Sequence, residues 1–197
     1  MKARKVKGLD PAETLVANAR RIVATRADEL YSFDPHGDPE ALHDMRIAAK
    51  RLRYVLEPTQ HLFGPYVGTA VRRTKELQDL LGELHDCDDM LPRVTRIMAT
   101  EHAAEAAELR ARAAPDARDL DPATVRDAPR ADAWRGLHAF AAWLEARRSV
   151  LHDAFLRQWT DLGRAGFRAR LEYALAERAP EPPAPDPEPA LAARTEP

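Results

Sequence analysis

Apolar residues recur at three- and four-residue steps along most of this chain, which is the spacing of helices that bury one face. Residues 41–57 show the pattern most clearly. Asp38 and Pro39 supply a cap and a first turn just before this stretch, and Pro58 is expected to end or kink the helix. Its apolar positions share one side: Leu42, Met45, Ala49, Leu52 and Leu56.

The same pattern predicts helices on both sides of this stretch. The first is expected to start at a capping box in which Asp10 is the N-cap and Glu13 completes the box. Pro92 is expected to kink the third helix or to break it in two. The expected ranges are about 10–30, 65–90, 90–113, 131–162 and 166–177.

Composition agrees with an all-α protein, because Ala, Leu, Arg and Glu are abundant and β-branched and aromatic residues are few. We expect an antiparallel helical bundle of about four long helices, some kinked or broken, over residues 9–178. Residues 1–8 are interpreted as a loose basic arm, and the Pro-rich residues 179–197 as a disordered tail. The sequence shows no signal peptide or membrane span, and its single cysteine suits a reducing compartment, so a cytoplasmic protein is expected.

A row of cations lies beside the apolar stripe of residues 41–57. At about 100° per residue, His43, Arg46, Lys50 and Arg53 share one face of the helix. Residues 45–75 hold seven of the chain's 30 basic residues and one of its 32 acidic ones. Such local asymmetry is typical of an anion site, although a solvated basic face would give the same pattern.

Other helices also carry polar residues in or beside their apolar stripes. Arg26 lies within the stripe of the first helix, and Arg148 and His152 lie within that of residues 131–162. In the third helix one flank carries Lys75, Gln78, Gly82 and His85. Cations from four helices favour a basic cavity or channel that holds a polyanion; the plainer alternative is that long side chains reach out to solvent.

Two linked motifs resemble the CHAD family, the conserved-histidine α-helical domain. HDMRIAAKRLRYVLE is similar to its H-x-x-R-x-x-x-K-R-x-R-Y helix, and LQDLLGELHDCDDML, about 20 residues later, is similar to its L-Q-x-x-L-G-x-x-R-D-x-D helix. The resemblance is clear over about residues 41–91 and loose over 10–178. It implies a helical-bundle module that binds inorganic polyphosphate through a basic channel, without chemistry of its own and with no cofactor.

The resemblance also implies which residues bind the polyphosphate. The motifs carry over His43, Arg46, Lys50, Arg51, Arg53 and Gln78, and less securely Lys75; Arg26, Arg148 and His152 come from the stripe pattern alone. Asp86 and Asp88 are expected to orient arginines. His85 stands where the family usually has arginine. The family usually carries the helical unit twice, and this chain carries it once, so a homodimer that brings two basic faces together is one hypothesis. Association with polyphosphate granules would fit this interpretation.

Other functions stay open at this point. Glu40-x-x-His43 is a possible half of a metal site in a bundle, and three His-Asp pairs, at 43–44, 85–86 and 152–153, are a weak sign of a phosphohydrolase. The basic face would also suit an acidic protein partner or a nucleic acid, although few aromatic residues interleave with the cations. We find no nucleophile with a positioned base and no glycine-rich phosphate loop.

Overall fold

The computed structural model describes residues 2–125 and 131–177, and in these ranges the chain is helical with no strand. The predicted disordered tail lies outside the described residues. The helices and two short 3-10 turns are α1 (Leu15–Leu30), α2 (Pro39–Thr59), η1 (Gln60–Leu62), α3 (Tyr66–Ala111), η2 (Pro122–Val125), α4 (Ala131–Arg164) and α5 (Phe167–Ala176).

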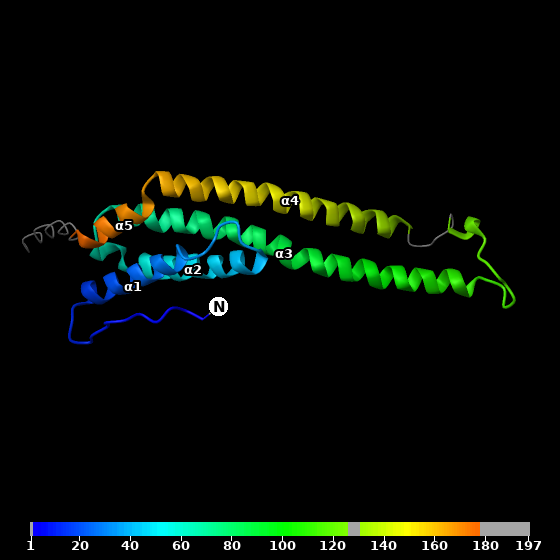
Figure 1. The fold of residues 1–197 in the computed structure, drawn as a ribbon, viewed down its shortest axis with the longest axis horizontal. Coiled ribbons are helices and arrows are strands. Elements are labelled where there is room, and N and C mark those ends of the chain that lie inside the picture. Colours follow the sequence, from blue (N-terminus) through cyan, green and yellow to red (C-terminus); the bar gives the residue numbers. More distant parts are fainter. Residues whose placement is uncertain (1, 126–130, 178–197) are drawn as a thin grey trace, which may run out of the picture.

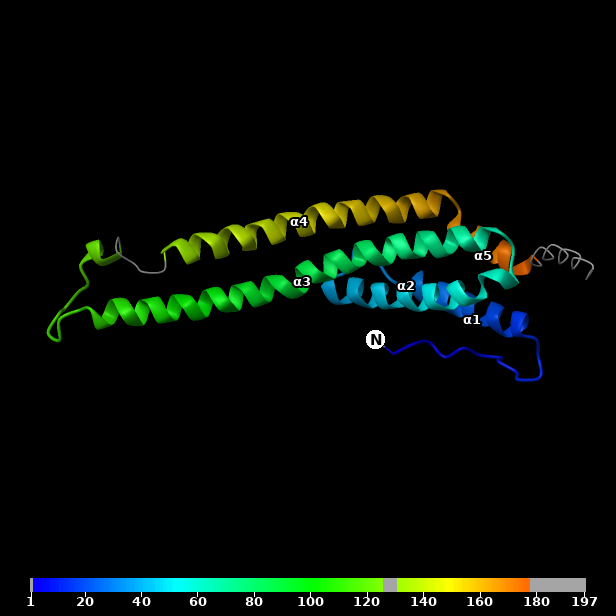
Figure 2. The same cartoon turned by 180° about the vertical axis from the view of Figure 1, so that it is seen from behind.

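The four longer helices pack in chain order, α1 on α2, α2 on α3 and α3 on α4, and neighbours run antiparallel (Figure 1). The short helix α5 packs across one end, mainly against α3. Because α3 and α4 are much longer than α1 and α2, their far halves form a two-helix hairpin that projects beyond the rest, as both views show (Figure 2). The predicted all-α fold is confirmed.

Two apolar clusters hold the helices together. The larger one joins all five helices, and every predicted apolar position of α2 lies in it, at 2% exposure or less. The smaller one lies between α3 and α4 in the hairpin and has only three buried members: Cys87, Val94 and Leu144. The hairpin is therefore held by a much thinner core than the body.

The first helix starts later than predicted. Its N-cap is Thr14, whose side chain accepts a hydrogen bond from the Ala17 amide, and Leu15, the first residue of the helix, is 64% exposed. Asp10 instead closes a separate turn by accepting from the Ala12 amide at 2.9 Å. Asp10-Pro11 therefore has the sequence of a helix start but forms a turn that lies four residues before α1 begins.

The expected break at Pro92 is wrong, because α3 continues through Pro92 to Ala111. Proline removes one backbone donor and crowds the preceding turn, which usually disrupts a helix. Here Leu91 and Val94 pack in the smaller cluster with Leu144 of α4. This packing on both sides of the proline holds the chain in one helix.

The turn between α4 and α5 depends on a glycine. Gly166 has φ +65°, in the left-handed region that other residues rarely adopt, and it precedes Phe167, the first residue of α5. Its carbonyl accepts the Arg170 amide at 2.9 Å. The predicted end of the long helix near residue 162 and the predicted short last helix are both confirmed.

Candidate functional site

The row of cations on α2 faces a matching polar row on α3. His43 and His85 fix the register, with their Nδ1 atoms 3.2 Å apart and their ring centroids 4.3 Å apart. Because the two helices run antiparallel, each step up α2 is matched by an equal step down α3. Arg46 is thereby level with Gly82, Lys50 with Gln78, and Arg53 with Lys75. We call these eight residues the basic seam.

The arginines of the basic seam have partly buried polar atoms without partners. Arg46 Nε and Arg53 Nε are buried and make no hydrogen bond, and neither does Gln78 Oε1 opposite them. A buried polar atom without a partner costs about 1–3 kcal/mol, so native structures rarely keep one without a reason. Three such atoms along one seam indicate that a ligand or ordered water completes it.

Few carboxylates balance the charge of the seam. Within the described residues, Arg46, Lys50 and Lys75 form no ion pair, and only Arg53 has a carboxylate, Glu57, at 3.2 Å. Lys50 and Arg53 instead lie over the exposed ring of Tyr54, at 5.5 and 4.9 Å from its centroid. The seam therefore presents a row of cations whose charge is open to an external anion.

The histidine pair lies at one end of this row. Burial lowers the pKa of His43 below its ordinary 6.5, and the neighbouring His85 and Arg46 lower it further. His43 is therefore neutral at pH 7 in the absence of a ligand. An anion bound beside it would favour the protonated form and raise this pKa, so binding and protonation are coupled.

Gly82 leaves open space in the middle of the seam. A glycine inside a helix costs about 1 kcal/mol relative to alanine, and the sequence suggested close approach of a helix or a ligand as its reason. No atom lies within 4 Å of where its Cβ would be. Among the described residues a packed helix is therefore not the reason, and the backbone of α3 here is accessible opposite Arg46.

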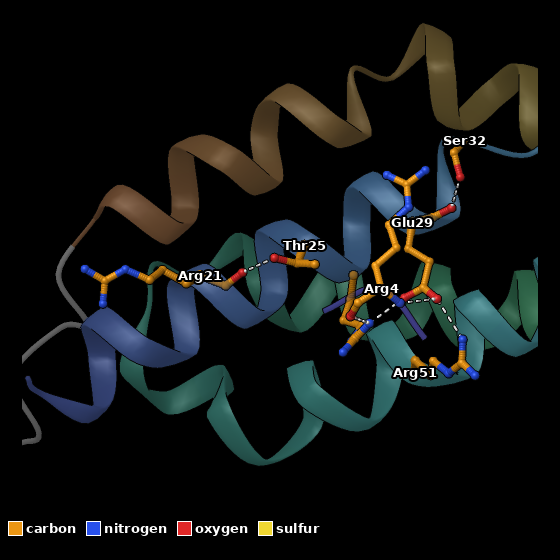
Figure 3. Close-up of polar contacts among 7 residues, drawn as sticks. Arg4, Arg21, Thr25, Glu29, Ser32 and Arg51 are labelled. Atoms are coloured by element: carbon orange, nitrogen blue, oxygen red, sulfur yellow. Dashed lines mark hydrogen bonds and ion pairs between the residues drawn. The ribbon is translucent and has the colours of Figure 1, made fainter. Parts of the chain in front are cut away.

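Two other predicted cations meet a buried carboxylate instead. Glu29 of α1 is fully buried and accepts from Arg26 at 2.6 Å and from Arg51 at 2.7 Å (Figure 3). Arg26 also donates to the backbone carbonyl of Arg4, and the Arg4 amide donates to Glu29 at 3.4 Å. The structure thus places Arg26 and Arg51 at the contact of α1, α2 and the N-terminal arm, and this contact tethers an arm that was expected to be loose.

The two predicted residues of α4 make other contacts in the structure. Arg148 donates to both oxygens of Asp88, whose side chain is 13% exposed, so Asp88 does orient an arginine. His152 packs near Phe155, with ring centroids 6.3 Å apart. Asp86 is exposed on α3. The structure therefore brings together His43, Arg46, Lys50, Arg53, Lys75 and Gln78, but pairs Arg26, Arg51 and Arg148 with carboxylates.

Sequence reasoning missed Glu29, although a signal was present. The residue lies three positions after Arg26, the spacing at which helical side chains meet, and directly before the buried Leu30. An arginine and an acid one turn apart inside an apolar stripe indicate a buried ion pair. Arg51 points away from the other cations of α2, and it is the third member of this cluster with Arg26 and Glu29.

Two features of the described residues bear on other functions. In residues 2–125 and 131–177, no three His, Cys, Asp or Glu side chains gather as metal ligands would. None of the helices described there combines the length and apolarity needed to cross a bilayer.

Comparison with known proteins agrees with the two motifs of α2 and α3. Residues 5–95 match the family model described as CHAD domain. No curated protein matches the chain, and no solved structure does. The match covers α1, α2 and about the first two thirds of α3, which include the whole basic seam, and leaves out most of the hairpin. The resemblance is confirmed: residues 5–95 of this chain match the CHAD domain family.

Proposed function

We propose that the chain binds inorganic polyphosphate along the basic seam and acts as a binding module without chemistry of its own. The observation that carries the proposal is the unpartnered state of the seam. Arg46 and Arg53 keep buried donors without acceptors, and Arg46, Lys50 and Lys75 form no ion pair within the described residues. CHAD domains are a polyphosphate-binding family, which supports the same ligand.

The spacing of the seam suits a linear polyanion. At 1.5 Å per residue, His43, Arg46, Lys50 and Arg53 span roughly 15 Å along α2 in steps of about 4.5–6 Å. A polyphosphate repeats a negative charge every few ångströms, so successive cations can meet successive phosphates. The arginines offer forked donors for two phosphate oxygens, while Lys50 contributes a point charge.

The opposite side of the seam would position the chain. The Gln78 side chain carries both an amide donor and an acceptor, and its Oε1 is buried without a partner. Gly82 leaves room beside Arg46, so a phosphate can approach α3 closely there. Lys75 is exposed and extends the row of charge beyond the half-buried part of the seam.

Titration calorimetry with long-chain polyphosphate at physiological salt tests the proposal. Arg46→Glu/Lys50→Glu should abolish binding while the circular dichroism spectrum stays that of the wild type. Arg96→Glu/Arg110→Glu is the matched control, because it makes the same charge change on exposed positions of α3 and should bind as the wild type does. Equal losses in both variants would mean that only net charge matters; no binding by the wild type would refute the proposal.

Competition separates polyphosphate from nucleic acid. Lys50 and Arg53 of the seam already lie over the ring of Tyr54, so this ring is a poor platform for stacking bases. We expect polyphosphate to displace a labelled single-stranded DNA of equal charge, and the DNA to displace labelled polyphosphate much less well. Equal displacement in both directions would indicate a general polyanion site.

A further inference from the structure

The helix α4 has a second apolar stripe on the side opposite its core contacts. Its inner side carries Leu137, Leu144 and Leu151, which pack against α3. Its outer side carries five small or apolar residues spaced by three, four, three and four positions. We call them the outer stripe: Gly136, Ala139, Trp143, Ala146 and Val150. This is the alternating spacing of a helix–helix seam.

The outer stripe has large apolar side chains in solvent. Trp143 is 53% exposed and Val150 is 66% exposed. Phe140, at the edge of the stripe, is 40% exposed and stacks on Trp143 with ring planes 14° apart. A helix that is apolar on two sides is typical of one buried between two layers, yet α4 has one layer, α3, beneath it.

No contact within the described residues explains why a glycine occupies position 136. It costs helix stability relative to alanine, and no atom lies within 4 Å of where its Cβ would be. In seams between helices, small residues are the holes that receive large side chains from the facing helix. The open space at Gly136 is such a hole, with nothing from the described residues in it.

The stripe is complementary to itself in the antiparallel direction. If two copies of α4 cross at Trp143, residues equally far before and after it face each other. Val150 then faces Gly136 and Ala146 faces Phe140, so that a large side chain meets a small one in both pairs, while Trp143 meets its own copy at the axis. We propose that the outer stripe of α4 is a twofold interface in which a second copy of this chain packs antiparallel, centred on Trp143.

The thin core of the hairpin is a further reason to expect a second copy of the chain on α4. Two helices with three fully buried side chains between them gain little from packing, whereas two hairpins stacked through α4 form four layers of helices. The contact from Gly136 to Val150 is roughly 21 Å long, near the small end of specific interfaces. A dimer of micromolar affinity is expected.

This dimer is independent of the anion site. The hypothesis drawn from the sequence placed two basic faces together, whereas the outer stripe lies on α4 and the basic seam on α2 and α3. Each copy would keep its own seam accessible. The number of polyphosphate sites per chain should therefore be the same in dimer and monomer.

Light scattering coupled to size exclusion, at low and high micromolar protein, tests the interface. The wild type should approach twice the 22.0 kDa chain mass at high concentration. Trp143→Glu should stay monomeric because it places charge at the twofold axis. Gly136→Met should also stay monomeric because it fills the hole, and its folding is safe, since the site is open and glycine is the poorer helix former.

The control is Ser149→Glu, an exposed neighbour of Val150 that lies off the stripe; it should dimerise as the wild type does. A wild type that stays monomeric at high micromolar concentration would overturn the proposal. So would a dimer that survives both Trp143→Glu and Gly136→Met, because it must use another face. Loss of the dimer in Ser149→Glu as well would show that charge on α4, rather than this stripe, controls association.

Discussion

Replacing Glu29 with glutamine tests whether the buried carboxylate holds α1, α2 and the N-terminal arm together. Glutamine keeps the size of the side chain but removes the negative charge that Arg26 and Arg51 share. Both arginines are largely buried, at 14% and 26% side-chain exposure, and Glu29 at 1%. The substitution therefore removes the buried carboxylate that both cations share from a partly desolvated site.

The expected loss of stability is large. Hydrogen bonds to charged groups contribute about 1.5–3 kcal/mol each, and breaking a buried ion pair costs about 3–5 kcal/mol. Glutamine still accepts one hydrogen bond, so we expect Glu29→Gln to lower the free energy of unfolding by about 2–4 kcal/mol. This is a large part of the roughly 5–15 kcal/mol that holds a typical domain together.

Urea denaturation followed by circular dichroism measures this loss. Asp28→Asn is the matched control: it is the adjacent acid, undergoes the same chemical change, and pairs with Arg168 at 2.6 Å on the surface. An exposed pair contributes at most about 1 kcal/mol, so Asp28→Asn should change stability little. If Glu29→Gln lost no more stability than Asp28→Asn, the structural role of the Glu29 cluster would be refuted.

The same variant separates structural arginines from binding ones. If Arg51 serves Glu29, then Arg51→Gln should cost much less in the Glu29→Gln background than in the wild type, because the two changes remove one interaction. Polyphosphate affinity of Glu29→Gln, measured where the protein is folded, should stay within a factor of about two of the wild type. A tenfold loss would place Arg51 or Arg26 in the binding site after all.

Three further predictions follow from the site and the fold. The folded-state pKa of His43 lies below its ordinary value, so the unfolded chain binds more protons than the folded chain between the two pKa values. The stability of the fold should therefore fall as the pH drops through about 6.5. Thermal melts at several pH values should show a smaller fall for His43→Gln than for the wild type. Added polyphosphate should stabilise more at the lower pH, and a pH-independent gain would contradict the coupling. Gly166→Ala should cost about 1–2 kcal/mol, because alanine resists φ +65°, while Gly163→Ala, which has ordinary φ, should cost nothing by urea denaturation. Arg148→Gln should lower stability, because it leaves Asp88 at 13% exposure without its partner, but should leave polyphosphate binding unchanged by calorimetry; weaker binding would return Arg148 to the site.

Local patterns predicted the fold well. The five predicted apolar positions of α2, from Leu42 to Leu56, repeat at helical spacing and are all buried. Apolar periodicity alone decides which face of a helix turns inward. Turn chemistry was less reliable. Asp10-Pro11 and Pro92 both carry strong local signals, yet one forms a turn before the helix and the other lies inside a helix. In both places contacts made elsewhere, at Thr14 and in the α3–α4 cluster, outweigh the local preference.

The site was predicted in part for a similar reason. His43, Arg46, Lys50 and Arg53 could be placed on one face, because helical geometry relates residues within a single helix. Which cations are paired could not be predicted, because an ion pair depends on neighbouring helices whose register the sequence does not give. In the sequence, Arg26 and Arg148 are candidates for the anion site for the same kind of reason as Arg46, namely a cation in or beside an apolar stripe. They pair with Glu29 and Asp88 in the structure, whereas Arg46 pairs with no carboxylate among the described residues.

The difference between paired and unpaired cations suggests how the chain combines stability with binding. A bundle whose cations were all unpaired would repel itself and lose stability without its ligand. Here the arginines between helices are matched with Glu29 and Asp88, and the open charge is concentrated on one seam, where His43 stays neutral in the absence of an anion. Neutral His43 reduces the repulsion in the empty seam, and its protonation would add a cation if the seam binds phosphate as proposed. The unliganded fold and the anion complex can therefore both be stable, with different charges at the same end of the seam.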